Sequence, residues 1–319
     1  MLAAMRQSFV PVQLVVLLGC SSVLGCGTNS SVAPVGIKPV ASNLAGNWLL
    51  AGSLPESPFQ FPSAPGTQLS VTFSTVGNQI VGSGMFQVGC PSGGSPGQTG
   101  FGGIGGGFVA SGTVADDGKF VAQSPATTAS GVAITSLSLS GTVPSTAGGT
   151  WSGSYTINTN GDGGCVLAES ASLTAEPIQP FSGTFVASGT YTSGATKSPV
   201  SVTMTLQQGT TSTGAGGAFL DEAYVLSGSL SVTGVPCFQT GVSVAPATPQ
   251  PTAVGGAVFG AMAFPAFKMN DGSLVVINVG ANDGGVSQLD ALPLGISGGN
   301  CASTPGGSQL QVGTFVRQK

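Results

Sequence analysis

The stretch Ser201-Val202-Thr203-Met204-Thr205-Leu206 decides the fold class of this chain. Its apolar side chains alternate with small polar ones, and a period of two residues places the apolar set on one face of an extended strand. A similar interleaving occurs over residues 70–73 and 132–139. Turn pairs such as Asp117-Gly118 lie between these stretches and supply the positive φ that tight hairpins require. The pattern predicts antiparallel β-structure.

The composition supports the same fold class. The chain has 53 glycines and 21 prolines in 319 residues, and only 6% of its residues are charged, against roughly 25% in an average soluble domain. Its 41% hydrophobic content supplies enough apolar surface to offset the entropy of ordering the chain. We expect an all-β protein without α-helices, in which about eight strands per half form an antiparallel β-barrel or a β-sandwich.

The two halves of the chain share one order of landmarks. Residues 44–53 align with residues 181–190 without a gap, which matches Gly46 with Gly183 and Trp48 with Phe185. The later landmarks are residues 70–73 with 201–204, Cys90 with Cys237, and Cys165 with Cys301. A duplicated domain is the simplest account of this order. We therefore expect two tandem β domains, over residues 43–177 and 178–319.

The start of the chain reads as a secretory leader. A single charge, Arg6, precedes the apolar stretch Phe9–Leu18, which is too short to span a bilayer. The tetrapeptides Leu17-Leu18-Gly19-Cys20 and Val23-Leu24-Gly25-Cys26 follow. Both resemble the lipobox of bacterial lipoproteins. The resemblance implies that the Cys receives a thioether-linked lipid, that cleavage occurs just before it, and that several acyl chains hold the protein at the membrane.

Two cysteines compete for this lipid. Cys20 directly follows the apolar stretch, whereas Cys26 leaves an even number of cysteines and precedes the flexible run Gly27–Ser31. We prefer Cys26, which gives a signal peptide over residues 1–25 and a tether over residues 26–42, and we keep Cys20 as the alternative. Neither Cys is followed by Asp, which in such lipoproteins often signals inner-membrane retention. The resemblance thus implies the outer membrane.

The other four cysteines are expected to form disulfides. An exported chain folds in an oxidising compartment, where paired thiols are oxidised. The repeat selects Cys90–Cys165 and Cys237–Cys301 from the three possible pairings. Loop-entropy arguments give each bridge about 4 kcal/mol of stabilisation. A redox or metal role is not expected, because the chain has no CxxC motif and no histidine.

Charge and residue types exclude several functions. The formal net charge is −4 and the cationic residues are scattered, so nucleic acid is not an expected partner. The absence of histidine excludes His-activated nucleophiles and imidazole metal ligation. A pair of carboxylates could still hydrolyse glycans. However, Asp116-Asp117 reads as a turn, and Asp221 and Glu222 would point to opposite faces of a strand. We expect no catalytic residue, no metal and no cofactor.

Two motifs resemble binding loops. Gly100–Gly105 satisfies G-x-G-x-x-G but lacks the strand before it and the helix after it that a dinucleotide site needs, so we interpret it as a flexible loop. Asn158–Gly163, followed by Glu169, nearly matches the EF-hand calcium loop. Its first position is Asn rather than Asp, Cys165 lies inside it, and its flanks read as strands. We predict a hairpin turn there.

Gly46-Asn47-Trp48 and Gly183-Thr184-Phe185 are similar to the G-x-W motif of lipocalins, in which the aromatic residue closes the floor of a barrel. This resemblance implies a carrier of a small apolar ligand. The simpler interpretation is a core aromatic residue that anchors the first strand of each repeat.

The sequence thus predicts a non-catalytic, lipid-anchored protein of the cell envelope with a structural, adhesive or interaction role. In its arrangement of leader, tether and β repeats it also resembles tandem all-β envelope lipoproteins of bacteria. A lipocalin-like carrier and a glycan-acting hydrolase are the alternatives. The expected partners are the membrane, through the N-terminal lipid, and a protein, a glycan or a small apolar ligand.

Overall fold

The structure is a computed structural model that describes residues 40–52, 66–90, 102–129, 132–159, 168–193, 195–212, 224–235, 241–242, 244–246, 256–269, 272–282, 284–291, 295–297 and 308–319. All of these residues belong to one compact unit, Ile37–Lys319. Within the described ranges there is no α-helix, and the one helical segment is the 3₁₀ turn η1 (Ala41–Leu44). The all-β prediction is confirmed. The predicted leader, Cys20 and Cys26 lie outside the described residues.

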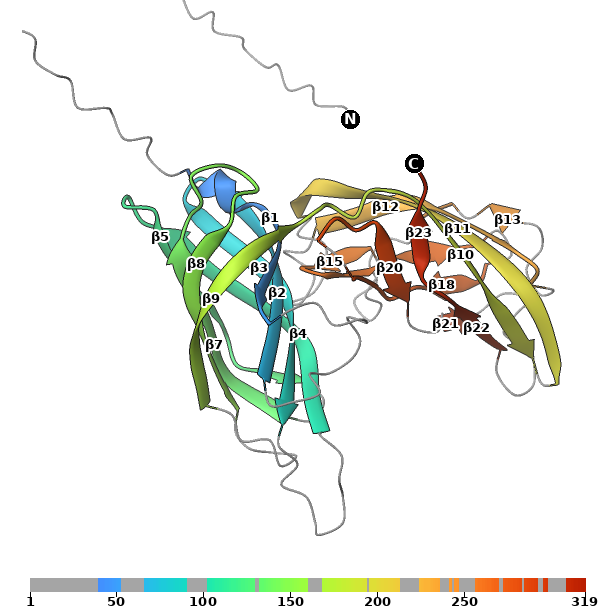
Figure 1. Cartoon of the computed structure of the whole chain (residues 1–319), viewed down its shortest axis with the longest axis horizontal. Helices are drawn as coiled ribbons and strands as arrows, with labels where there is room; N and C mark the ends of the chain where they lie inside the picture. Colours follow the sequence, from blue (N-terminus) through green and yellow to red (C-terminus); the bar gives the residue numbers. More distant parts are fainter. Residues whose placement is uncertain are drawn as a thin grey trace, which may run out of the picture. The chain divides into compact units, whose positions relative to one another are not determined.

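Strands of the first half close into a barrel of eight antiparallel strands (Figure 1). Each strand pairs with the next in chain order, except that β5 pairs with β7 instead of β6, and β9 returns to pair with β1. The short strand β6 pairs only with β7 among the described strands. The strands are β1 (Gly46–Ala51), β2 (Gly66–Val76), β3 (Gln79–Cys90), β4 (Gly102–Val114), β5 (Lys119–Ser124), β6 (Thr127–Ala129), β7 (Val132–Thr142), β8 (Trp151–Thr159) and β9 (Ala168–Ile178).

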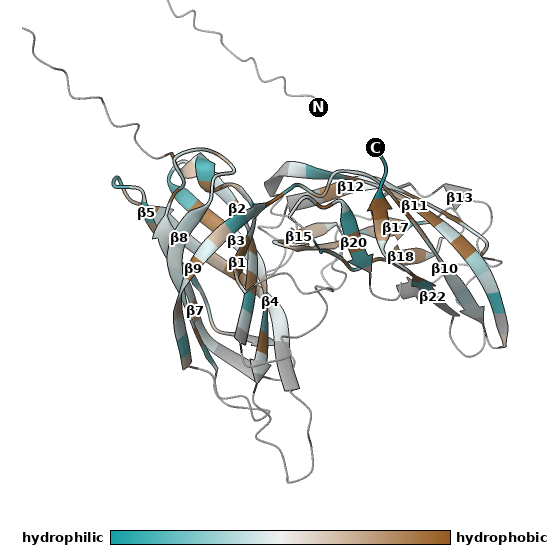
Figure 2. Ribbon diagram, viewed as in Figure 1, coloured by the Kyte–Doolittle hydropathy of each residue, from teal (hydrophilic) through white to brown (hydrophobic). Residues whose placement is uncertain are grey.

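Alternation along each strand fills the interior of this barrel. Strand β5 illustrates it, because Phe120 and Ala122 are buried while their neighbours are exposed. Glycine on the inner face makes room for aromatic rings: a Cβ atom on Gly84 would lie 2.3 Å from the ring of Phe108. The abundant glycine therefore supports a packed core as well as the turns. Figure 2 shows hydrophilic and hydrophobic residues interspersed along the same strands.

Aromatic rings fill one end of the barrel beneath η1. Trp151 makes edge-on contacts with Trp48 and Phe120, with ring centroids 6.1 and 5.0 Å apart. Phe73 lies edge-on to Phe120 at 6.0 Å. The indole N–H of Trp48 donates a 2.8 Å hydrogen bond to the Leu44 carbonyl, which ties η1 to the first strand. Trp48 is therefore a core residue of β1 that also helps to close this end of the barrel.

Three local predictions concern segments at the ends of strands. Asp116 and Asp117 lie in the turn between β4 and β5, as predicted. Asn158 pairs with Ala168 where β8 and β9 run antiparallel, and residues 160–167, on which the predicted turn falls, lie outside the described residues. The interpretation of the G-x-G-x-x-G segment as a loop is wrong, because residues 102–105 open β4 and pair with β3. Backbone hydrogen bonds form this ladder, and they require no side chains.

The second half forms a curled sheet and a smaller sheet. The curled sheet runs β11-β10-β23-β20-β19-β16-β15-β12-β13, and β11 also pairs with β12, which bends the sheet back on itself. The smaller sheet runs β14-β17-β18-β21. The strands are β10 (Gly183–Ser193), β11 (Thr196–Ser212), β12 (Tyr224–Thr233), β13 (Gly241–Val242), β14 (Val244–Pro246), β15 (Ala257–Phe259), β16 (Met262–Phe264), β17 (Ala266–Lys268), β18 (Leu274–Val276), β19 (Val279–Ala281), β20 (Gln288–Ala291), β21 (Gly295–Ser297), β22 (Ser308–Val312) and β23 (Phe315–Arg317).

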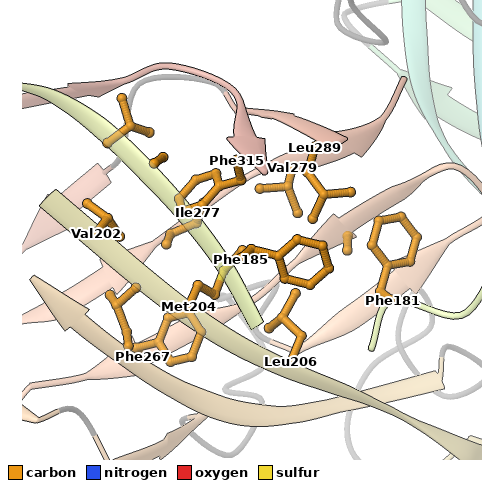
Figure 3. Close-up of a cluster of buried hydrophobic side chains, with 14 of the residues drawn as sticks. Phe181, Phe185, Val202, Met204, Leu206, Phe267, Ile277, Val279, Leu289 and Phe315 are labelled. Carbon is orange, nitrogen blue, oxygen red and sulfur yellow. The ribbon is translucent and has the colours of Figure 1, made fainter. Parts of the chain in front are cut away.

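A second hydrophobic cluster lies between these strands (Figure 3). Phe181, Phe185 and Phe267 are fully buried in it, together with Met204. Leu49, from the outer face of β1, also belongs to this cluster rather than to the barrel core. The described residues thus form two large cores, and β1 contributes side chains to both. A small third cluster joins Ala257 and Phe259 to Met85 and Phe264.

The landmarks of the sequence repeat occupy similar local positions. Gly46 and Gly183 precede the buried Trp48 and Phe185, and both glycines have positive φ, at 135° and 138°. One detail of the alignment is wrong, however. Trp48 pairs with Val71 on β2, whereas Phe185 pairs with Met204 on β11, so residues 70–73 correspond to residues 203–206. A slip of two residues keeps the same side chains on the inner face, which is why the sequence pattern conceals it.

Polar contacts join the outer faces of β1 and β2 to the second half. The side-chain amides of Asn47 and Gln208 exchange hydrogen bonds of 2.8 and 3.0 Å. The Thr72 hydroxyl donates to Asn47 Oδ1 at 2.9 Å and accepts from the Gly260 N–H at 2.7 Å. Asn47 and Thr72 are both buried, so each needs these partners to offset its lost hydration.

The disulfide predictions are not tested. Cys90 ends β3, but its side chain is not among those described, and Cys165, Cys237 and Cys301 lie outside the described residues. Both pairings therefore remain predictions. In the part of the chain that the structure describes, no helix is long and apolar enough to cross a membrane.

Candidate functional site

A cavity of about 580 Å³ lies beside the barrel where β1 ends. Pairing between β1 and β9 extends only over Asn47–Leu49 and Glu176–Ile178, so the described pairings stop there while β9 continues. Apolar residues of its wall are Leu49, Leu50, Ala51 and Leu173, and polar residues of its wall are Thr67, Tyr155, Ser172, Thr174, Glu176 and Asn282. Leu50, Tyr155 and Leu173 belong to the barrel core. The wall therefore combines side chains of the barrel core with exposed side chains of β9.

Two polar residues of this wall, Thr67 and Tyr155, meet Glu169 on the inner face of the barrel. The Tyr155 hydroxyl donates to one carboxylate oxygen of Glu169, and the Thr67 hydroxyl donates to the other at 2.6 Å. Thr67 lies on β2 and Glu169 on β9, the two strands that flank β1. Their hydrogen bond therefore bridges β2 and β9. We call Thr67, Tyr155 and Glu169 the carboxylate trio.

Strand alternation explains why these polar residues face inward. Thr67 is two residues from the buried Leu69, and Glu169 is four residues from the buried Leu173. Even spacing places both on the inner faces of their strands. Thr67 and Tyr155 are only 8% and 5% exposed, so their hydroxyl groups depend on protein partners for hydrogen bonds.

The environment of Tyr155 favours its neutral form. Burial, and next the hydrogen bond to Glu169, raises the pKa of Tyr155 to about 12. Burial raises the pKa because the charged phenolate would lose its hydration. The hydrogen bond raises it because only the neutral phenol can donate to the Glu169 carboxylate. At physiological pH the Tyr155 hydroxyl therefore remains protonated and committed to Glu169.

The described carboxylates do not form a hydrolytic pair at this cavity. Glu169 and Glu176 are seven residues apart on β9, which corresponds to about 23 Å along an extended strand. An odd separation also places them on opposite faces of the sheet. Asp221 and Glu222 lie outside the described residues. Within the described ranges, no group of three or more potential ligands could hold a metal ion.

A second cavity, of about 400 Å³, lies near η1 at the filled end of the barrel. Its wall includes Val40, Gly77, Val114 and Asp116, and no member of the carboxylate trio belongs to the described wall. The cavity beside β1, which we call the side cavity, is therefore the better candidate site.

The sequence alone points to one member of this site, and in a different role. Its pattern makes Glu169 the last position of a calcium-like loop, whereas in the structure Glu169 accepts hydrogen bonds from two hydroxyl groups. Neither Thr67 nor Tyr155 is predicted as a site residue. The sequence does contain one usable signal. Glu169 is four residues from the apolar Leu173, so it lies on the same face of the strand, and a charged residue on a buried face requires partners.

Comparisons of the chain with protein-family models, with curated proteins and with solved structures found no match. The site must therefore be interpreted from its own geometry.

Proposed function

We propose that this chain is a non-catalytic, lipid-anchored protein of the bacterial cell envelope that binds a small molecule in the side cavity. The observation that carries the binding role is the convergence of core side chains and of Thr67 and Tyr155, which both bond to Glu169, on one cavity of about 580 Å³. Ligand sites are concave, mostly apolar, and have a few fixed polar groups that orient the ligand. Leu50 and Leu173 supply apolar surface here, and Tyr155 and Thr67 supply fixed polar atoms.

The anchor and the location rest on the sequence. The two lipobox-like tetrapeptides support lipidation of Cys26, with Cys20 as the alternative, and the absence of a following Asp supports the outer membrane. Attachment through several acyl chains would hold the protein stably at the membrane surface.

We further propose that the chain is a tandem duplication of one β domain. Three features support this: the matched positive φ of Gly46 and Gly183, the matched burial of Trp48 and Phe185, and the presence of two large hydrophobic clusters, one in each half apart from the contributions of Leu49 and Ile178 to the second. The side cavity adjoins the first domain, at the strand that contributes to both cores.

A structural or adhesive role without a small ligand is the second candidate. The filled aromatic end of the barrel favours it, because Trp48, Trp151, Phe73 and Phe120 leave that end occupied by side chains. A carrier that holds its ligand along the barrel axis would need that space. The side cavity does not use that space, so the aromatic packing is compatible with ligand binding beside β1.

Blocking the side cavity tests this function. Thr174 lies on the exposed face of β9 in the cavity wall, and Thr174→Trp would fill the space. Ser170→Trp is the matched control, because Ser170 is exposed on the same face of the same strand and does not belong to the described wall. The probes are 4-phenylbutylamine, 4-phenylbutan-1-ol and 4-phenylbutyrate, which share one apolar body.

Saturation-transfer NMR on the full chain in lipid nanodiscs reports the binding of each probe. We expect the wild type and Ser170→Trp to bind at least one of the three, and Thr174→Trp to bind it at least tenfold more weakly. Equal binding by all three proteins would place the probe elsewhere and contradict the proposal. So would the absence of binding to the wild type for all three probes.

A further inference from the structure

The hydroxyl protons of Thr67 and Tyr155, the two buried hydroxyl groups of the side-cavity wall, already form hydrogen bonds to Glu169. Tyr155 and Thr67 each donate their proton to Glu169, so the oxygens of these two hydroxyls remain available only as hydrogen-bond acceptors. The Glu169 carboxylate has about four acceptor positions, of which these two bonds use two. The carboxylate trio therefore offers acceptors, rather than donors, to anything that enters the cavity.

The described wall of the cavity carries negative charge without a positive partner. Glu176 belongs to the wall, and Glu169 lies one hydrogen bond behind it. No Lys or Arg occurs among the described wall residues, and the one described ion pair joins Lys119 to Asp117 in the turn between β4 and β5. An anion entering this space would face carboxylates in a partly desolvated environment, where like charges repel strongly.

Apolar side chains complete the wall. Leu50 and Leu173 are 1% and 7% exposed and contact the barrel core, and Leu49 lies on the opposite face of β1. A ligand that fits this wall has an apolar body for these side chains and a donor-rich head group for the trio.

We infer that the side cavity takes an organic ammonium ion with an apolar body, such as a primary amine attached to a short hydrocarbon or aromatic group. This inference rests on the proposed function, because it names the class of ligand for the same cavity. An ammonium group has three donors and no acceptor, which complements the acceptors of the carboxylate trio. Its charge complements Glu169 and Glu176.

The ranking of the three matched probes tests the inference. On the wild type at pH 7 and low salt, we expect 4-phenylbutylamine to bind at least tenfold more tightly than 4-phenylbutan-1-ol, and 4-phenylbutyrate to bind most weakly. Isothermal titration calorimetry gives the three dissociation constants. The apolar body is constant, so the differences report the head group.

Two charge variants identify the groups responsible. Glu169→Gln keeps the size of the side chain and removes its charge, and we expect it to reduce the preference for amine over alcohol at least threefold. Glu176→Gln should reduce the preference less, because Glu176 is exposed and its charge is screened. The control is Asp290→Asn on β20, which removes a charge outside the described cavity wall and should leave the preference unchanged.

The possible failures are distinguishable. Equal binding of amine and alcohol, or tighter binding of the acid, would overturn the inference while leaving the side cavity as a binding site. An unchanged preference in Glu169→Gln would also overturn it. The absence of binding by all three probes would contradict the proposed function itself.

Discussion

Tyr155 on β8 donates its hydroxyl proton to Glu169 on β9, one diagonal step away across an antiparallel pair. The directly paired residues are Tyr155 with Ala171 and Ile157 with Glu169. Diagonal neighbours are within reach of long side chains on the same face of a sheet. This contact places a carboxylate on the inner face of the barrel, away from the aromatic rings beneath η1.

The first prediction concerns the pH dependence of stability. The folded state holds the pKa of Tyr155 at about 12, above the ordinary value of 10, so the folded chain keeps this proton where the unfolded chain loses it. Stability must therefore fall as pH rises from about 10 towards 12. Tyr155→Phe has no phenol to ionise, so it should lose less stability over this pH range. Urea unfolding at pH 9.5 and 11.5 measures it, and an identical loss in both proteins would contradict the assignment.

Removing the bridge between β2 and β9 should destabilise the fold. Thr67→Val keeps the shape of the side chain but deprives the Glu169 carboxylate of a 2.6 Å hydrogen bond. Hydrogen bonds to charged groups contribute about 1.5–3 kcal/mol, so we expect a loss in that range. Thr67→Ser retains the hydroxyl and should lose less than half as much. If both variants unfold at the same urea concentration, the hydroxyl has no such role.

The contact between Gly260 and β2 should be sensitive to a single methyl group. Gly260 has a φ of +63°, and a Cβ atom there would lie 2.4 Å from the backbone nitrogen of Val71. Gly77 is the matched control, with a φ of +61° and nothing within 4 Å of its Cβ position.

Both Gly260→Ala and Gly77→Ala introduce backbone strain of about 1–2 kcal/mol. Gly260→Ala also displaces β2 from the β15–β16 turn, and crowding of a packed contact costs about 1–3 kcal/mol. Its loss in the free energy of unfolding should therefore exceed that of Gly77→Ala by an amount in that range. Equal losses would show that this contact does not form.

The two tryptophans should differ in what their indole N–H contributes. The N–H of Trp48 donates to the Leu44 carbonyl, whereas that of Trp151 is buried with no partner among the described residues. Trp48→Phe therefore removes a hydrogen bond, while Trp151→Phe removes an unsatisfied donor.

We expect Trp48→Phe to be the more destabilising of the two by about 1 kcal/mol. The chain has two tryptophans, so each variant keeps a single fluorescent reporter for urea unfolding. A larger loss in Trp151→Phe would contradict the assigned hydrogen bonds.

Local patterns in the sequence are sufficient to predict the all-β fold class, but they do not predict that the first sheet closes into a barrel. Alternation over residues 201–206 correctly predicted part of β11, and Asp117-Gly118 correctly predicted a turn. The choice between barrel and sandwich depends on the β1–β9 and β5–β7 pairings, which no local pattern specifies. The glycine-rich start of β4 reads as a loop in the sequence, because glycine has no side chain whose alternation could reveal a strand.

The site was harder to predict than the fold. Thr67 and Glu169 are 102 residues apart in the chain, and the strand order and register of the closed barrel bring them together. Spacing along the sequence therefore could not reveal the carboxylate trio. The side cavity also depends on the early end of β1, since it lies where the described β1–β9 pairing stops.

Intermolecular NOEs between 4-phenylbutylamine and methyl-labelled leucine and valine residues test the central claim most directly. The side cavity predicts contacts from the phenyl ring to the methyl groups of Leu50 and Leu173, and the loss of both in Thr174→Trp. Contacts confined to exposed residues such as Val76 and Val121 would place the probe on the outer surface and contradict the claim.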